Sequence, residues 1–460
     1  MKKILVNLYY SLFLLTPLLM FPKTSELFEF NKTLFIYVIA GIIGFHWLFR
    51  TVRERKVTFY RTPFDIFLLL FFGSQLLSTI FSIDRHTSFY GYYGRFNGGL
   101  LSLIAYIVLF YGFISLFRNI DTRKILKLSL LSSFVVILWG LSGKIGYDLT
   151  CFVFTGQLNN ACWTDQFRPA ERMFSTLGQP NWLGAYLAIN FFIGLYFYLT
   201  SNSVIPDLIR DPKKYLDSRF LASLKLRRSG RGNDRSRGND EFVWLAYLIL
   251  NFVAILFTRS RSALLGLIVG LTYCYMVILF RERKLWKRFI PLVVVILLSV
   301  LIFKTGVSQI DNIFQNPKSK IQISNSNQQL TNNNLSSEVT ESLDIRKIVW
   351  KGAWELGLRY PLFGTGVETF AYAYNFVRPQ EHNLTSEWDY IYNKAHNEYL
   401  NYLATTGFLG LGTYLLFIGS VAWLVYFQLK TKSENGKTTA KNLELICLSA
   451  GWITILITNF

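Results

Sequence analysis

Long hydrophobic segments alternate with short polar ones along almost the whole chain. Each segment has roughly the length that an α-helix needs to cross the hydrocarbon core of a bilayer. The eleven segments are residues 4–21, 33–49, 66–83, 99–117, 125–143, 181–200, 242–258, 262–280, 285–303, 399–428 and 443–460. They are continuously apolar, without the alternation of a lipid-facing strand, which disfavours a transmembrane barrel. The pattern therefore predicts an all-α integral membrane protein with about eleven transmembrane helices.

Composition supports this prediction. Hydrophobic residues make up 52% of the chain, aromatic residues 17% and charged residues only 17%, which is unlike a soluble domain. No small-residue cleavage site follows Phe21, so we expect the first segment to remain as a helix. The sequence stops at Phe460 inside an apolar run, which indicates a longer protein with twelve or more such helices.

The net charge of +20 follows membrane sidedness rather than indicating a nucleic-acid partner. If the N-terminus is cytoplasmic, it and the short inside loops hold 30 of the 48 Lys and Arg residues. These loops are residues 50–61, 118–127, 201–240, 281–288 and 430–441. By the positive-inside rule, residues 304–397 would lie on the outer side of the membrane.

Two polar loops divide the chain. Residues 1–303 would hold nine helices and a basic cytoplasmic insertion at 201–240, whose direct repeat of Arg-Gly-Asn-Asp marks it as a solvated insertion without function. Residues 304–397 would form a long outside loop, and residues 398–460 the last two helices. Within the long loop, apolar residues at 345, 348, 349, 353 and 356 predict an amphipathic helix that ends before Pro361. We expect it to cover a cavity between the transmembrane helices.

Cysteine usage leaves one question open. Cys151 and Cys162 share an outside loop, where an oxidising compartment permits a disulfide, but sequence cannot test their geometry. Cys274 and Cys447 lie in hydrophobic segments, where a small buried residue is the ordinary interpretation.

His396 is the most informative ionisable residue. It stands at the end of the long loop, and we expect it within the first turn of the helix at 399–428, where the chain enters the membrane. The positive end of that helix and the nearby Lys394 both disfavour the imidazolium form. A neutral imidazole suits a general base. The alternative is a histidine that caps the helix or hydrogen-bonds at the interface.

Several outside arginines could bind an anion. Arg259 and Arg261 lie in a turn of a few residues between two helix ends, and guanidinium groups bind phosphate oxygens in a bidentate way. Contact with lipid headgroups is the alternative. Arg346, on the amphipathic helix, would join them if that helix folds back over the bundle. Arg95 and Arg172, in two other outside loops, are weaker candidates.

Other motifs favour structural roles or are missing. Asn181 is placed to cap the helix at 181–200 or to offer its amide to the site. Gly407, Gly410 and Gly412 favour close helix contact. The sequence has no metal-ligand spacing, phosphate-binding loop or dinucleotide fingerprint, so we predict a reaction without metal or cofactor.

Four stretches in order resemble a known family of bacterial membrane glycosyltransferases, the O-antigen ligases and O-antigen polymerase-like proteins. They are Phe174–Gly184, Ser260–Ala263, Arg346–Trp350 with Pro361–Phe370, and His396–Leu400 before Gly407. No one stretch is specific alone, but their order and the long outside loop carry the resemblance.

The resemblance implies a helical bundle of the GT-C type in a bacterial inner membrane, with residues 304–397 as a long periplasmic loop. Such a protein transfers a glycan from undecaprenyl diphosphate to an acceptor on the periplasmic side. Carried over, His396 would be the base that activates the acceptor hydroxyl. Arg261 and Arg346, with Arg259, would bind the donor diphosphate, and displacement would invert the anomeric carbon. Secondary candidates are Arg172, Asn181, Arg95, Asn397, Glu398 and Tyr399.

Alternatives remain at this point. The acceptor could be a glycolipid such as the lipid A core, a growing glycan or a protein. A flippase or transporter that moves the lipid-linked glycan without chemistry is a different class, but its charges would be expected near the membrane midplane. A sensor with a signalling loop finds no supporting motif.

Overall fold

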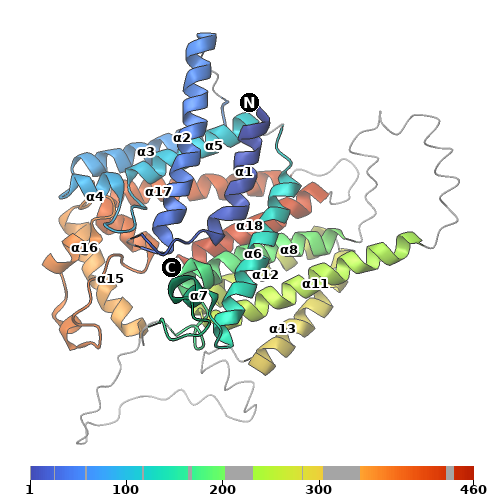
Figure 1. Ribbon diagram of the computed structural model, residues 1–460. Coiled ribbons are helices and arrows are strands. Elements are labelled where there is room, and N and C mark those ends of the chain that lie inside the picture. The colour runs from blue at the N-terminus through green and yellow to red at the C-terminus, as the bar shows by residue number, and fades with distance from the viewer. Residues whose placement is uncertain are drawn as a thin grey trace, which may run out of the picture. The chain divides into compact units, whose positions relative to one another are not determined.

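The computed structural model describes residues 2–24, 26–56, 60–116, 119–163, 168–201, 232–281, 283–303, 342–430 and 440–459 (Figure 1). These residues form helices and turns, and no strand occurs among them. Each of the eleven predicted hydrophobic segments contains a helix. The all-α fold class is confirmed.

The helices of the hydrophobic segments are α1 (Lys2–Leu15), α2 (Glu29–Glu54), α3 (Asp65–Ile80), α5 (Leu100–Leu116), α6 (Thr122–Lys144), α8 (Pro180–Thr200), α11 (Gly232–Thr258), α12 (Arg261–Arg281), α13 (Phe289–Phe303), α17 (Glu398–Lys430) and α18 (Ala440–Thr458). Within the described ranges, eight helices are long and apolar enough to cross a membrane, and α3 and α5 are apolar but shorter. The first segment is shorter than expected, because α1 ends at Leu15 and Thr16-Pro17 follows in a 3₁₀ turn. The chain is a multi-pass membrane protein.

Shorter helices connect these elements. They are α4 (Arg85–Tyr90), α7 (Leu149–Thr155), α15 (Ser342–Arg359), α16 (Phe370–Ala373) and the 3₁₀ turns η1 (Thr16–Leu18), η3 (Ser175–Leu177), η5 (Arg283–Arg288), η6 (Tyr374–Phe376) and η7 (Gln380–Leu384). Most of the basic insertion, residues 202–231, and the first part of the long loop, residues 304–341, lie outside the described residues. The last nine residues of the insertion are helical, because α11 begins at Gly232.

The chain forms two compact units that are not consecutive stretches of sequence. Unit 1 consists of Met1–Ile125, Asn312–Leu424 and Asn459–Phe460. Unit 2 consists of Leu126–Asp311 and Val425–Thr458. Each unit is described below by itself.

In unit 1, α15 is the predicted amphipathic helix. Its apolar stripe packs into a core with side chains of the following loop and of α17. The buried members are Ile345, Val349, Ala353, Leu356, Phe370, Ala373, Tyr374, Tyr392, Ala395 and Ala404. Their burial withdraws apolar surface from water and fixes α15 against the segment that leads into α17. The predicted stripe is confirmed.

A turn from the long loop inserts at a break in α17. Gly407 has φ 68° and ψ −172°, so the helix is interrupted there. The backbone N–H groups of Thr365 and Gly366 donate to the carbonyls of Ala404 and Thr405 over 3.1 and 2.9 Å. The Phe408 N–H donates to Pro361 over 2.7 Å. These bonds satisfy groups that the break releases, so the loop is anchored to the helix by backbone contacts.

In unit 2, α8 is the central helix. Its side chains are buried along most of its length, and it packs against α11, α12 and α18. Cys151 and Cys162 form a disulfide, with their Cα atoms 5.5 Å apart. The question that sequence left open is therefore answered: the two cysteines are bonded. Cys274 and Cys447 are free and buried.

Candidate functional site

His396 lies immediately before the cap of α17, not in its first turn as the sequence suggested. The helix begins at Glu398, and the Asn397 side chain accepts a hydrogen bond from the Leu400 N–H over 3.1 Å. Asn397 is therefore the capping residue. His396 adopts a left-handed conformation with φ 53°, which costs energy for a residue with a Cβ and tends to persist where neighbours fix it.

The neighbours of His396 come from α15 and from the loop before α17. The ring of Tyr392 meets the His396 ring edge-on, with centroids 5.7 Å apart. The indole N–H of Trp350, on α15, donates to the carbonyl of Ala395 over 3.1 Å. His396 is exposed, and the residue before it is hydrogen-bonded to α15 through Trp350.

The surroundings of His396 favour the neutral imidazole. Desolvation by neighbouring protein atoms is the largest cause that lowers the pKa of His396, and the positive charge of Arg346 is the second. Lys394 and Arg95 act in the same direction, whereas Glu387 opposes them. The direction predicted from sequence agrees. Its causes were given as the helix end and Lys394, whereas desolvation and Arg346 are the two largest. A neutral imidazole at pH 7 is able to accept a proton.

The cations around His396 are not equivalent. Arg95 pairs with Glu29 over 3.3 Å, and Asn97 also donates to that carboxylate over 2.6 Å. Lys394 pairs with Glu368 over 3.3 Å. In the part of the chain that the structure describes, Arg346 makes no such ion pair. Arg346 is therefore the cation beside His396 with charge left for an anionic ligand.

In unit 2, Arg259 and Arg261 flank the turn between α11 and α12, as predicted. Both are exposed, and Arg259 has φ 50°. Between them Ser260 is buried and its hydroxyl faces the start of α12, within 3.4 Å of the Ala263 N–H. Neither guanidinium forms an ion pair among the described residues, so both could meet phosphate oxygens.

Arg172 and Asn181 are connected in a way that sequence did not reveal. The Arg172 guanidinium donates to the Asn181 side-chain oxygen and to the Thr258 carbonyl, each over 3.3 Å. Asn181 is the second residue of α8, whose N-cap position is occupied by Gln179 without a side-chain cap. The interpretation of Asn181 as the cap is therefore wrong. Arg172 instead ties the start of α8 to the residue before Arg259.

A family model described as O-antigen ligase matches residues 246–415. Over this stretch the chain is similar to the O-antigen ligase family. The matched region runs from α11 into α17 and includes Arg259, Arg261, Arg346 and His396. The comparison gave no match among curated proteins or solved structures.

The candidate residues of the matched region and its surroundings fall in two groups. Unit 1 brings together His396, Arg346 and Arg95, and unit 2 brings together Arg172, Asn181 and the turn that carries Arg259 and Arg261. A single site formed by both groups stays a prediction.

Glu398 and Tyr399 have structural contacts. The Glu398 N–H donates to the Asn459 carbonyl over 2.8 Å, and the ring of Tyr399 lies 6.1 Å from that of Tyr414. A binding role for either residue is untested. Within the described ranges, no three His, Cys, Asp or Glu side chains gather as metal ligands, and a reaction without metal remains a prediction.

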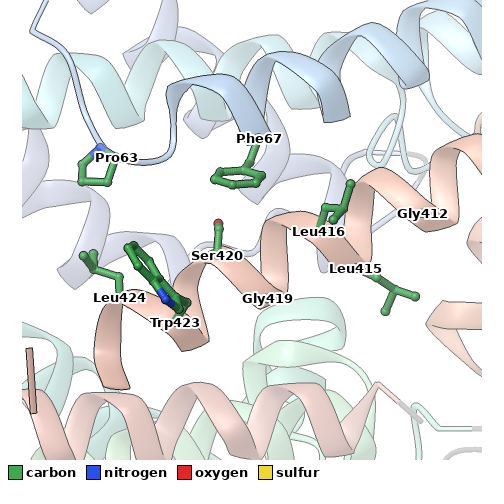
Figure 2. A pocket seen from close by; sticks show the side chains of 9 residues that line it. All are labelled: Pro63, Phe67, Gly412, Leu415, Leu416, Gly419, Ser420, Trp423 and Leu424. Atoms are coloured by element: carbon green, nitrogen blue, oxygen red, sulfur yellow. The ribbon is translucent and has the colours of Figure 1, made fainter. Parts of the chain in front are cut away.

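A cavity of about 780 Å³ in unit 1 lies away from His396. Figure 2 shows Pro63 and Phe67 on one side and residues of α17 on the other. The α17 residues are Gly412, Leu415, Leu416, Gly419, Ser420, Trp423 and Leu424. Gly412 comes fourteen residues after Glu398, the first residue of α17, and beyond the break at Gly407. The cavity has no charged lining residue and is not covered by α15, so it is not the expected diphosphate site.

Proposed function

We propose that the protein transfers a glycan from undecaprenyl diphosphate to an acceptor hydroxyl at the periplasmic face of the bacterial inner membrane. The similarity of residues 246–415 to the O-antigen ligase family supports the membrane glycosyltransferase class. The observation that carries the finer proposal is the pairing of His396, whose pKa is lowered, with Arg346, the neighbouring cation that has no ion pair among the described residues. A base and an anion-binding cation are the two groups that this transfer needs.

The chemistry is a displacement at the anomeric carbon. His396 accepts the proton of the acceptor hydroxyl while the hydroxyl oxygen forms a bond to the anomeric carbon. The bond from the anomeric carbon to the diphosphate oxygen breaks, and the diphosphate leaves with the electron pair. Arg346 would neutralise the negative charge that develops on the diphosphate. Attack opposite the leaving group inverts the configuration.

The disulfide supports the proposed orientation. Disulfides persist in oxidising compartments such as the periplasm, and the Cys151–Cys162 bond lies in a loop on the side that charge counting assigns to the periplasm. Charge counting places the His396 loop on that same side. The acceptor could be the lipid A core, a growing glycan or a protein, and we propose only that it presents a hydroxyl group.

Reconstitution tests the proposal. Purified protein in liposomes is given an undecaprenyl diphosphate-linked glycan and a panel of acceptors, with product mass as the readout. We expect transfer by the wild type, loss of transfer with His396→Ala, and normal transfer with His86→Ala, because His86 is an exposed histidine of unit 1 on α4.

Two outcomes would contradict the proposal. Wild-type turnover by His396→Ala would remove the base. Movement of the donor across the bilayer by wild type and mutant alike, without any product, would favour a non-catalytic flippase or transporter instead.

A further inference from the structure

Glu368 is held in an unusual position in the turn before α16. It has φ 59°, a left-handed conformation, and its side chain is only 8% exposed. Its carboxylate packs against Gly98: a Cβ on that glycine would come 2.4 Å from Glu368 Oε1. A buried, strained carboxylate needs a compensating partner. That partner is Lys394, with 3.3 Å between Nζ and Oε1.

The turn that carries Glu368 is rigidly supported. Gly366 and Thr365 are bonded to the broken part of α17, as described above. On the other side, the Ser88 hydroxyl donates to the carbonyl of Val367 over 2.8 Å. Glu368 is therefore fixed to α17 and to α4, whereas Lys394 belongs to the loop that carries His396. The ion pair joins a fixed point to that loop.

We propose that the Glu368–Lys394 ion pair is a positioning device that holds His396 in place for catalysis. The inference deepens the proposed function and rests on His396 being the base. Lys394 stands two residues before His396, and Trp350 holds Ala395 between them from the α15 side. The loop is thus fixed from two directions, and the left-handed conformation of His396 is maintained between these two supports.

The competing role for Lys394 is direct contact with the donor diphosphate. Three carboxylates surround Lys394: Glu368 is the largest cause that raises the pKa of its ammonium group, and Glu398 and Glu29 act in the same direction. This arrangement keeps Lys394 charged but already neutralised. Arg346, without an ion pair among the described residues, is better suited to the diphosphate.

The test compares variants of the pair with a matched control. Glu368→Gln and Lys394→Gln break the pair, and Glu368→Asp keeps the charge but shortens the side chain. Lys351→Gln is the control, because Lys351 and Glu381 form an ion pair of 3.2 Å that is exposed on both sides. We expect kcat to fall about 10- to 100-fold in both Gln variants with KM within about threefold, a smaller fall in Glu368→Asp, and no change in Lys351→Gln.

The pH profile supplies a readout that simple destabilisation would not move. The charged groups that act on His396 are Arg346 from α15, Arg95, Glu387 and Lys394. Removing the positive charge in Lys394→Gln should move the acid limb of kcat to higher pH. Glu368→Gln removes the negative charge and leaves the positive charge of Lys394 unopposed. The acid limb of kcat should therefore not move to higher pH in this variant.

The outcomes separate this inference from the proposed function. If the wild type transfers glycan and His396→Ala does not, but Glu368→Asp and both Gln variants turn over like the control, the positioning role is wrong while the base stands. A rise in KM with unchanged kcat in Lys394→Gln would overturn it in favour of substrate binding. If the Gln variants do not fold, Glu368→Asp decides: normal kcat contradicts the inference. An inactive wild type would instead contradict the proposed function.

Discussion

Trp350 on α15 donates its indole N–H to the carbonyl of Ala395, the residue directly before His396, over 3.1 Å. Arg346 lies one helical turn earlier on the same helix, and residues four apart share a helix face. The orientation of α15 that allows the indole hydrogen bond therefore also places the Arg346 guanidinium on the side of the His396 imidazole. The positive charge of Arg346 lowers the pKa of His396 because of this arrangement.

Replacing Arg346 should weaken use of the donor. We expect Arg346→Gln to lower kcat/KM about 100-fold, because one guanidinium contact to a charged group contributes about 1.5–3 kcal/mol. Arg346→Lys should recover only part of the loss, because an ammonium group keeps the charge but not the bidentate geometry. Steady-state kinetics with a defined polyprenyl diphosphate donor provide the measurement.

A matched control for Arg346 stands next to it. Lys347 is exposed and pairs with Asp344 over 2.8 Å, so Lys347→Gln removes a positive charge from the same helix without touching the candidate site. Its kinetics should equal those of the wild type. Equal losses in Lys347→Gln and Arg346→Gln would mean that α15 acts through its overall charge, and the specific role of Arg346 would be abandoned.

Sequence predicted the parts of this molecule that depend on local periodicity. The apolar stripe of α15 could be located from Ile345 to Leu356 because a 3.6-residue period is visible in one segment. The pairing of Lys394 with Glu368 could not, because it joins two loops whose meeting is decided by the tertiary fold. The cap of α17 was likewise missed, although Asn397 is a residue type that favours that position.

The pH dependence of transfer should reflect the lowered pKa of His396. A general base works when deprotonated, so activity rises with pH through its pKa. Because desolvation by neighbouring protein atoms and the positive charge of Arg346 lower that pKa, the acid limb should lie below about 6.5, the ordinary value of histidine. Transfer should therefore be near its maximum at pH 7.

The same profile measured for Arg346→Gln tests the cause. Removing the positive charge raises the pKa of His396, so the acid limb should move to higher pH while Lys347→Gln leaves it in place. A wild-type limb at or above 6.5, or no movement in Arg346→Gln, would show that the imidazole does not carry the titration.

Gly407 should tolerate no side chain. Its φ of 68° is in the left-handed region, and a Cβ would come 2.6 Å from the backbone of Leu362. We expect Gly407→Ala to lower the free energy of unfolding by about 1–3 kcal/mol, because the backbone would be strained and the Cβ would overlap the backbone of Leu362. Gly412→Ala is the matched control, because no atom lies within 4 Å of its Cβ position. Thermal unfolding of the purified protein in detergent should separate them, and equal melting temperatures would contradict the helix break.

The disulfide should report the sidedness of the protein in cells. A Cys274→Ala/Cys447→Ala variant keeps only Cys151 and Cys162, which are bonded. If their loop faces the oxidising side of the membrane, a thiol-reactive polymer should shift this variant on a gel only after reduction. Labelling without reductant would place the loop in the cytoplasm, and charge counting would then place His396 there too, away from a periplasmic donor.

Replacing Cys151 and Cys162 with serine should lower the free energy of unfolding by about 2–3 kcal/mol, because the bond closes a short loop.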